Sequence, residues 1–437
     1  MNKILNMYTT FPLDKKLSEL VGKYGGVVQA VQNVIVDVDD PQIYFSVAVP
    51  NNPKIFQPEM DGLIEEVTSG VGETEESANN SAVGEAVERY CSGYVQKNRL
   101  LFGAYKKSAK NYMAIDDYIN NNHSEDSRIE ADVPLIYGWV YGENLTKAEK
   151  VLVPAAIVWD TYKPILPQET YLTHGQVSGS ACGRTQTEAS INGLLEVIER
   201  DSFMITWLNK LAVSKIDVYS FPKVKEIFGE FFQRDSFELH LVDTTTDIGI
   251  PSVFGIMKSA DGKLYVGGSA RIDMESAVIK TLLEITQLYI GNKNIMYSTT
   301  KARIEANAIK KSSDRIQYYL QQEAHKNLDF LYKSQVIKSY VDYKTYAGNE
   351  QQKLTFIIEK LKAANLDSII VDVTTEDVKS VGLSVVKAVI PGTVPLIYSE
   401  NEKQLNNRRI FDLPVKLGYS DTALHVAELN TNPHPFP

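Results

Sequence analysis

The chain has 437 residues, of which 43% are hydrophobic and 23% charged, and its formal net charge at pH 7 is −10. This length allows one large domain or two ordinary ones, with a substantial buried core. The acidic balance argues against a nucleic-acid-binding protein, and the absence of any apolar run of about 18 residues argues against a membrane protein.

The N-terminal sequence predicts a small α/β segment. Residues 17–24 have the spacing of a short amphipathic helix, and VVQAVQNVIVDV (27–38) and IYFSVAVP (43–50) alternate as strands do. We expect this segment, residues 1–65, to pack on a larger domain of residues 66–437. The first residues, MNKILNMYTTFPLDKK, have no cleavage site and too short an apolar stretch for a signal peptide, so we expect a cytoplasmic protein.

A helix with an unusual polar stripe is predicted next, at SAVGEAVERY (81–90), after a loop at GVGETEESAN (70–79). Ser77 and Asn79 in this loop, with Asn80 directly after it, are the candidate helix caps. Small apolar residues fill most of the helix surface, so we expect it to be mostly buried. An ion pair between Glu85 and Arg89 is the simple alternative. The polar residues share a stripe roughly 100° wide; they are Ser81, Glu85, Glu88 and Arg89.

The same stripe returns in a second helix. Between the two, the chain is polar at 104–132, and β-branched and aromatic residues predict strands at 133–142 and 151–160. A loop, THGQVSGSACGRT (173–185), then precedes NGLLEVIERD (192–201). The offsets of the first stripe are repeated by Asn192, Glu196, Glu199 and Arg200. Two helices with one unusual stripe suggest a shared target.

A third long helix is predicted from Met274 to Ile290, after strands at FELHLVD, PSVFGIMKS and KLYVGGSA. It carries Glu284 and Gln287 three residues apart, on one face of an apolar frame. This spacing is common in helices, so the pair indicates a site only when it is considered together with the two polar stripes. A strand–loop–strand unit follows at 368–392, and the chain ends in NTNPHPFP.

The polar residues of the three helices indicate a nucleotide site. Several carboxylates that face one cavity repel one another unless protons or a cation neutralise them. Oxygen ligands without a cluster of His or Cys favour Mg²⁺ over zinc, and Mg²⁺ sites usually hold phosphates as well. The two arginines of the stripes would then bind phosphate oxygens. The pattern therefore predicts a nucleoside triphosphate with Mg²⁺.

Familiar nucleotide and hydrolase motifs are absent from the sequence. A P-loop is excluded because Ser178 and Arg184 stand where its first glycine and its lysine are required, and no GxGxxG, GxSxG, HExxH or CxxC motif occurs. We interpret His174 as a capping or surface residue, with ligand contact as the alternative. We interpret Cys91 and Cys182, the only cysteines, as reduced packing residues, with a catalytic thiol as the alternative.

Taken jointly, these motifs resemble the YcaO superfamily over about residues 66–437. The resemblance rests on SxxxExxER (81–89), the segment ending in GLLEVIERD (183–201), ExxQ (284–287) and three shorter motifs, which are TTDIGIP (245–251), VIPG (389–392) and the terminal PxPxP. It implies an α+β fold of the YcaO type, with mixed sheets and helices that carry the acidic motifs. It also implies ATP and Mg²⁺ as cofactors and phosphorylation of a backbone amide oxygen.

The resemblance also implies roles for individual residues. Mg²⁺ coordination is implied for four glutamates, which are Glu85, Glu88, Glu196 and Glu199. Contacts with ATP are implied for Ser81, Arg89, Asn192, Arg200 and Gln287, with Glu284 as a further candidate.

The proline-rich tail indicates which branch of the family the chain resembles. Pro433, Pro435 and Pro437 make a stiff extended segment, although a disordered terminus is the alternative on composition alone. Azoline-forming members share this ending, so the resemblance implies that the carboxylate of Pro437 enters the active site as a general base or orienting group. We also expect no attached E1-like leader-binding domain, so the chain resembles the separate D protein of a C/D pair.

We therefore expect an ATP-dependent cyclodehydratase that converts Cys of a ribosomally made precursor peptide to azolines, with Ser and Thr as further substrates left open. The expected partners are the precursor peptide and an E1-like protein; a flavin dehydrogenase and a homodimer are left open, and neither nucleic acid nor membrane is expected. Two alternatives stand beside this hypothesis. One is a YcaO enzyme that forms a thioamide or an amidine, and the other is a scaffold subunit with a vestigial ATP site.

Overall fold

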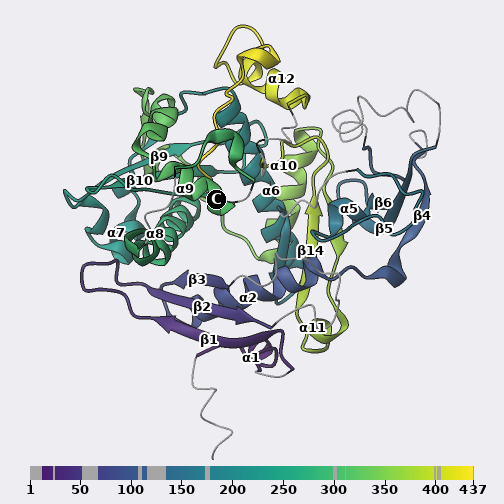
Figure 1. Ribbon diagram of the computed structural model, residues 1–437. Helices are drawn as coiled ribbons and strands as arrows, with labels where there is room; N and C mark the ends of the chain where they lie inside the picture. Colours follow the sequence, from purple (N-terminus) through teal and green to yellow (C-terminus); the bar gives the residue numbers. More distant parts are fainter. Residues whose placement is uncertain are drawn as a thin grey trace, which may run out of the picture.

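Three long helices each pack between two of three β-sheets in the described part of the chain (Figure 1). The helices are α2 (Glu75–Gly93), α6 (Gln186–Leu208) and α8 (Met274–Ser298). The computed structural model describes residues 12–436 except 23–24, 52–66, 107–110, 116–133, 173–177, 299–302, 311, 398–399 and 401–404. This combination of separate sheets and helices confirms the predicted α+β fold.

The N-terminal sheet is antiparallel, with the order β1-β2-β3. Its strands are β1 (Val28–Val34), β2 (Tyr44–Pro50) and β3 (Thr68–Gly72). The first two were predicted, although β1 ends before Ile35, whose side chain is 96% exposed. The predicted domain boundary at 65/66 lies outside the described residues, and β3, which follows it, pairs with β2.

The second sheet has the order β11-β10-β9-β8-β12 and is antiparallel except for the parallel pair β8 and β12. Its strands are β8 (Lys215–Ile216), β9 (Phe237–Asp243), β10 (Ser252–Ser259), β11 (Leu264–Ala270) and β12 (Ile337–Lys338). The sequence predicted the three longer strands correctly. The two-residue strands carry too short a pattern to be recognised in a sequence.

The third sheet has the order β4-β5-β13-β14-β7, and β6 pairs with β5 beside this path. Its strands are β4 (Leu101–Ala104), β5 (Ile136–Asn144), β6 (Glu149–Pro154), β7 (Ser180–Gly183), β13 (Ile369–Asp372) and β14 (Ser384–Val389). β7 corrects the sequence analysis, which placed these four residues in a loop. Their small side chains gave no strand signal, and the pairing with β14 sets their conformation.

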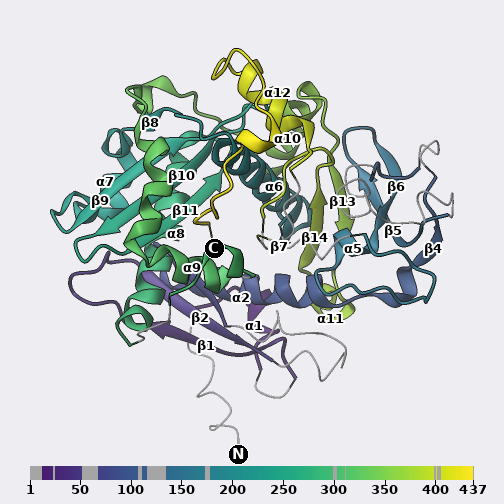
Figure 2. The same cartoon turned by 45° about the horizontal axis from the view of Figure 1, so that its top comes forward.

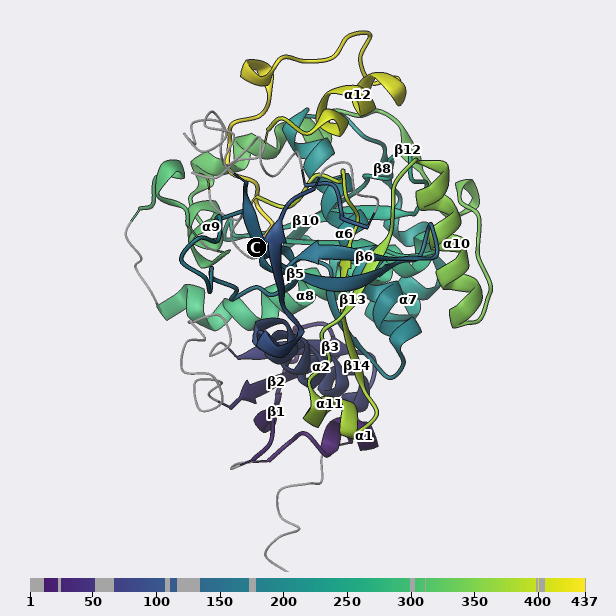
Figure 3. The same cartoon turned by 90° about the vertical axis from the view of Figure 1, so that its right-hand side faces the viewer.

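The other helices are shorter; they are α1 (Lys15–Ser18), α5 (Ala155–Val158), α7 (Pro222–Phe228), α9 (Ser312–Tyr319), α10 (Glu350–Ala363), α11 (Glu376–Ser380) and α12 (Arg408–Lys416). The amphipathic helix predicted for residues 17–24 is wrong in its bounds, and Tyr24 lies outside the described residues. In a side view, the N-terminal sheet and α12 occupy opposite ends of the molecule (Figure 3). Among the described residues, no helix combines the length and apolar character needed to cross a membrane.

Helix α2 begins earlier than the sequence suggested. Thr74 is its N-cap, and the side chains of Thr74 and Ser77 each accept a hydrogen bond from the other residue's backbone N–H. Ser77 is therefore the third residue of the helix, and the predicted capping role of Asn79 is wrong because Asn79 is a buried helical residue. A capping box with two hydroxyl residues lies outside the usual Ser/Thr-x-x-Glu pattern, which explains the error.

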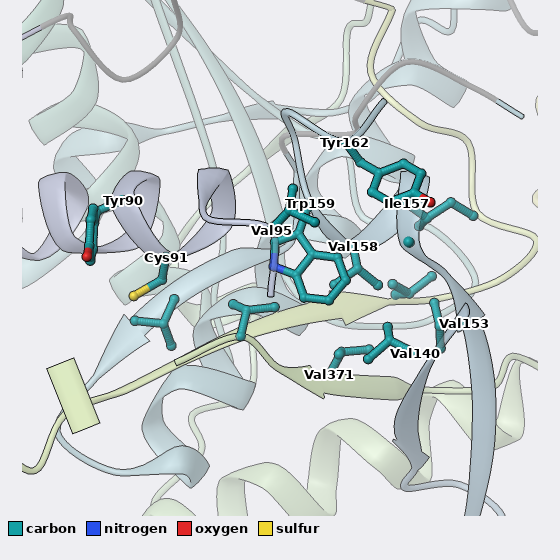
Figure 4. Close-up of a cluster of buried hydrophobic side chains, with 14 of the residues drawn as sticks. Tyr90, Cys91, Val95, Val140, Val153, Ile157, Val158, Trp159, Tyr162 and Val371 are labelled. Carbon is teal, nitrogen blue, oxygen red and sulfur yellow. The ribbon is translucent and has the colours of Figure 1, made fainter. Parts of the chain in front are cut away.

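A buried cluster around Trp159 joins the end of α2 to the third sheet (Figure 4). Val140, Val153 and Val371 line it from three strands, and Cys91 enters it from α2. Cys91 is a free and fully buried thiol, which agrees with its interpretation as a packing residue. Cys182 differs, because it is only partly buried and lies on β7 beside the central cavity described below.

A buried ion-pair network ties α6 to α12. Arg409 Nη2 lies 2.6 Å from Asp201 Oδ2 and 3.0 Å from Asp247 Oδ1, and Asp201 is fully buried. Asp201 Oδ1 also accepts a hydrogen bond of 2.8 Å from the backbone N–H of Val394. The network therefore fixes the last third of α6 against the C-terminal part of the chain.

Replacing Arg409 by methionine should lower the free energy of unfolding by about 3–5 kcal/mol, because the buried carboxylate of Asp201 would lose this counter-charge and Asp247 would lose one of its two cationic partners. Lys416→Met is the matched control: Lys416 also pairs with Asp247, but its side chain is 59% exposed, so a loss below about 1 kcal/mol is expected. Urea unfolding measures both values. Equal losses in the two variants would contradict the importance of the buried pair.

Candidate active site

A central cavity of about 1090 Å³ lies where the three long helices meet. Its wall contains most of the site residues predicted from the sequence, namely Ser81, Glu85, Glu88, Asn192, Glu196, Glu199, Arg200, Glu284 and Gln287. Arg89 is not in this wall; its Nη2 lies 2.6 Å from Glu85 Oε1, in the i, i+4 ion pair that was the simple alternative. Pro437 lies outside the described residues, as does His174.

Tight packing behind α2 turns its polar stripe toward the cavity. Ala82, Val83 and Val87 are fully buried on the other faces of the helix. A side chain at Gly70 on β3 would come within 2.4 Å of the Ala82 backbone N, so only glycine allows the strand to approach this closely. The predicted burial of the helix is therefore confirmed.

Helix α6 is fixed by a similar close approach. A side chain at Gly193 would come within 2.7 Å of the carbonyl oxygen of Gly179, which itself has φ +92°. At this contact the backbone N–H of Gly179 donates a hydrogen bond of 3.0 Å to Glu196 Oε2. The two glycines thus bring the segment before β7 against α6 and orient one of the predicted carboxylates.

The carboxylates of α2 and α6 oppose one another in the cavity. Burial raises the pKa of Glu88 well above its usual value, and repulsion from Glu196 and Glu85 raises it further. The pKa of Glu196 is raised by burial against the opposing charge of Arg200. The stripes predicted to share a target therefore do face one region.

The cations of the cavity are held close to these carboxylates. Arg200 Nε lies 3.4 Å from Glu199 Oε1, and Lys280 Nζ lies 3.6 Å from Glu284 Oε1. The sequence analysis missed Lys280, Arg184 and Arg271, which also line the cavity. Lys280 could have been found from its position four residues before Glu284, whereas the other two lie outside the helical stripes.

Gln287 contacts the N-terminal sheet. Its Nε2 donates hydrogen bonds to the backbone oxygen and to Oγ of Ser69 on β3, at 3.1 and 2.8 Å. The side chain therefore joins α8 to β3 in the wall of the cavity. Its contact with ATP stays a prediction.

The side chains that line the cavity have the chemistry needed to bind Mg²⁺ and a polyphosphate. The glutamates supply hard oxygen ligands, and a cation among them would relieve the repulsion that raises their pKa values. Arg200, Arg271 and Lys280 supply positive charge for phosphate oxygens. In the described part of the chain, no three His, Cys, Asp or Glu side chains lie close enough together to hold a metal ion as they stand. The individual Mg²⁺ ligands therefore stay predictions.

Folding without a metal should become less favourable at higher pH. Burial raises the pKa of Glu199 from 4.5 to about 8, Arg200 opposes the shift, and Glu284 adds to it. Because this pKa is higher in the folded than in the unfolded chain, folding takes up a proton between these two pH values. The free energy of unfolding in EDTA should therefore fall through this window, by at most about 1.4 kcal/mol per pH unit for this group.

Urea unfolding at several pH values in EDTA measures this slope, and Glu199→Gln should reduce it. Added Mg²⁺ should oppose the fall, because a bound cation stabilises the ionised carboxylates. A profile that rises with pH through this window would contradict the predicted environment of Glu199.

Comparison with known proteins agrees with this cavity. The sequence model of the family described as YcaO cyclodehydratase, ATP- and Mg²⁺-binding, matches residues 69–394. The chain belongs to the YcaO family. The match contains all three long helices and confirms the resemblance found in the sequence. As a YcaO protein, the chain takes ATP and Mg²⁺ as cofactors, as the sequence predicted.

The chain is similar in sequence to one further protein and in structure to a solved heterocyclase. An uncharacterized protein of Methanothermobacter thermautotrophicus is 26% identical over 346 residues, which are 76% of this chain and 82% of that protein. A heterocyclase in complex with substrate and cofactor has a TM-score of 0.78 and 22% identity, over 96% of this chain. This chain covers only 56% of that heterocyclase.

A second solved structure is similar in length to this chain. The Escherichia coli microcin synthetase McbBCD complex contains a chain with a TM-score of 0.63 and 17% identity. The match covers 93% of this chain and 96% of that one. At these identities the two structures establish the YcaO fold.

Proposed function

We propose that this YcaO protein is an ATP-dependent cyclodehydratase that converts Cys residues of a ribosomally made precursor peptide to azolines. The main support is the convergence on one cavity of the two acidic stripes, Arg200 and the C-terminal tail. Figure 2 shows the tail running from α12 into the space between α6, α8 and α2. Phe436, the last described residue, lies in the wall of the cavity.

In the proposed reaction, the Cys thiol attacks the preceding carbonyl carbon and forms a C–S bond. Bound ATP with Mg²⁺ supplies the phosphoryl group that makes the former amide oxygen a good leaving group. The C–O bond then breaks, and the thiol and amide protons are lost, so the peptide loses one water while ATP becomes ADP and phosphate. Arg200 and Lys280 would stabilise negative charge on the phosphates. The carboxylate of Pro437 would accept a proton or orient the peptide.

We propose that an E1-like partner binds the leader of the precursor peptide. The support is that the McbBCD chain, which this chain matches in fold over nearly all of both chains, belongs to a multi-subunit synthetase complex. A flavin dehydrogenase that oxidises the azoline would be a further partner. We also infer a cytoplasmic location, where ATP and newly made peptides are present.

Mass spectrometry of the peptide product tests the function. The chain is incubated with ATP, Mg²⁺ and a leader-bearing peptide, with and without a candidate E1-like partner protein. Loss of one water per modified Cys, together with one phosphate released, is expected, with strong stimulation by the partner. Exchange of oxygen for sulfur would instead indicate a thioamide-forming enzyme, and no ATP turnover with partner and peptide present would indicate a scaffold subunit.

A further inference from the structure

The end of the tail packs directly against an arginine of the cavity. The Phe436 ring is 3% exposed, and the Arg200 guanidinium carbon lies 4.0 Å from its centroid. The ring also packs against Phe203 of α6 and Phe254 of β10, with centroids 5.1 and 5.8 Å away. Behind it, a side chain at Gly268 would come within 2.6 Å of the ring, so β11 is shaped to receive it.

Helix α9 holds the backbone of the tail just before Phe436. The Tyr319 hydroxyl donates a hydrogen bond to the carbonyl of Pro433, and Arg315 Nη1 donates one of 3.3 Å to the carbonyl of His434. Arg315 is 1% exposed and also pairs with Glu400 at 2.7 Å. With prolines at 433 and 435, the tail has little backbone freedom between these anchors and its end.

Arg200 needs such support because its side chain is long and its neighbours compete for it. Arg200 Nε lies 3.4 Å from Glu199 Oε1 and Arg200 Nη2 lies 3.7 Å from Glu196 Oε1, so both carboxylates attract the guanidinium. An aromatic face attracts a guanidinium and fixes its plane by stacking. The Phe436 ring therefore sets the direction in which the guanidinium N–H groups of Arg200 point.

We propose that Phe436 is a positioning residue that orients Arg200 for the nucleotide, and that Tyr319 and Arg315 fix Phe436 through the tail backbone. This inference rests on the proposed function only in assigning Arg200 to the nucleotide phosphates. It gives the segment around α9 a role that the sequence did not suggest. It also makes docking of the tail and binding of nucleotide mutually favourable, because both require one orientation of Arg200.

Binding of a non-hydrolysable ATP analogue with Mg²⁺, measured by calorimetry without peptide, tests the proposal. Phe436→Leu keeps an apolar side chain but removes the aromatic face, and should weaken binding about threefold to thirtyfold. Phe436→Tyr should restore it. Phe330→Leu is the matched control, because Phe330 is a buried aromatic residue whose ring centroid lies 5.5 Å from that of Trp207 on α6, and it does not line the cavity.

A double-mutant cycle tests whether the effect passes through Arg200. In an Arg200→Met background, Phe436→Leu should cause no further loss of analogue affinity. The proposal is overturned if Phe436→Leu binds the analogue as tightly as wild type, if Phe330→Leu weakens binding equally, or if the two losses simply add.

A milder pair of variants on α9 decides the question if Phe436→Leu does not fold. Tyr319→Phe removes one hydrogen bond to the tail and should weaken analogue binding about twofold or more. Tyr318→Phe is its control, because the Tyr318 hydroxyl accepts a hydrogen bond of 3.4 Å from Asn327 Nδ2. Equal affinities in the two variants would overturn the proposal. A chain that shows these binding losses but forms no azoline would uphold it while refuting the proposed function.

Discussion

Replacing Glu196 or Glu199 by glutamine is expected to reduce ATP consumption at least about a hundredfold, because each change removes a charge from the proposed Mg²⁺ shell. Glutamine has almost the volume of glutamate, so the packing of α6 should be preserved. Burial already raises the pKa values of both carboxyl groups, which means that the cavity tolerates their neutral forms. We therefore expect inactive variants that unfold at or above the wild-type denaturant concentration.

Phosphate release in the presence of partner and peptide measures the turnover, and circular dichroism checks the fold. Glu76→Gln is the matched control, because Glu76 is an exposed glutamate in the first turn of α2 and does not line the cavity. It should retain wild-type turnover. A glutamine variant of Glu196 or Glu199 with turnover within about threefold of wild type would remove that residue from the Mg²⁺ shell.

Converting the C-terminal carboxylate of Pro437 to an amide is expected to cut azoline formation severely while nucleotide affinity changes little. Amidation removes the charge and leaves every side chain in place, including Phe436. The proposed base would then be lost, but the contact between Phe436 and Arg200 would remain. An amide made by intein cleavage, compared with the acid released from the same fusion, isolates this single change.

Product yield by mass spectrometry and analogue affinity by calorimetry separate the two roles of the tail. Deleting both Phe436 and Pro437 should lower the yield and the affinity together, unlike amidation. An amidated protein that cyclises peptide at the wild-type rate would show that the tail only packs, and the proton would then pass to some other group.

The long elements were predictable because their local sequences favour one conformation. α8 follows helical spacing, and β9, β10 and β11 are short apolar runs that contain β-branched and aromatic residues. β7 failed because its residues, Ser180–Gly183, take their conformation from pairing with β14. The arrangement of three sheets around three helices was equally hidden, since it depends on contacts between distant parts of the chain.

The site was predictable where its chemistry follows a helix face. The stripes of α2 and α6 predicted the opposing carboxylates, because charged residues on a buried helix are costly unless they are paired or bind a ligand. Arg271 was missed because it follows β11 in a short connection without periodicity. Arg89 pairs with Glu85, four residues back, and is not among the residues of the cavity wall, so its contact with ATP stays a prediction.

Arg200 and Asp201 are adjacent on α6, yet one lines the cavity and the other is tied to Arg409 on α12. The ion pair between Asp201 and Arg409 thus links the position of Arg200 to α12, a helix at the molecular surface. Directed evolution could exploit this arrangement, because libraries confined to α12 would shift the end of α6 by small steps without altering any lining side chain. Catalytic rate and nucleotide preference could then be adjusted from outside the pocket.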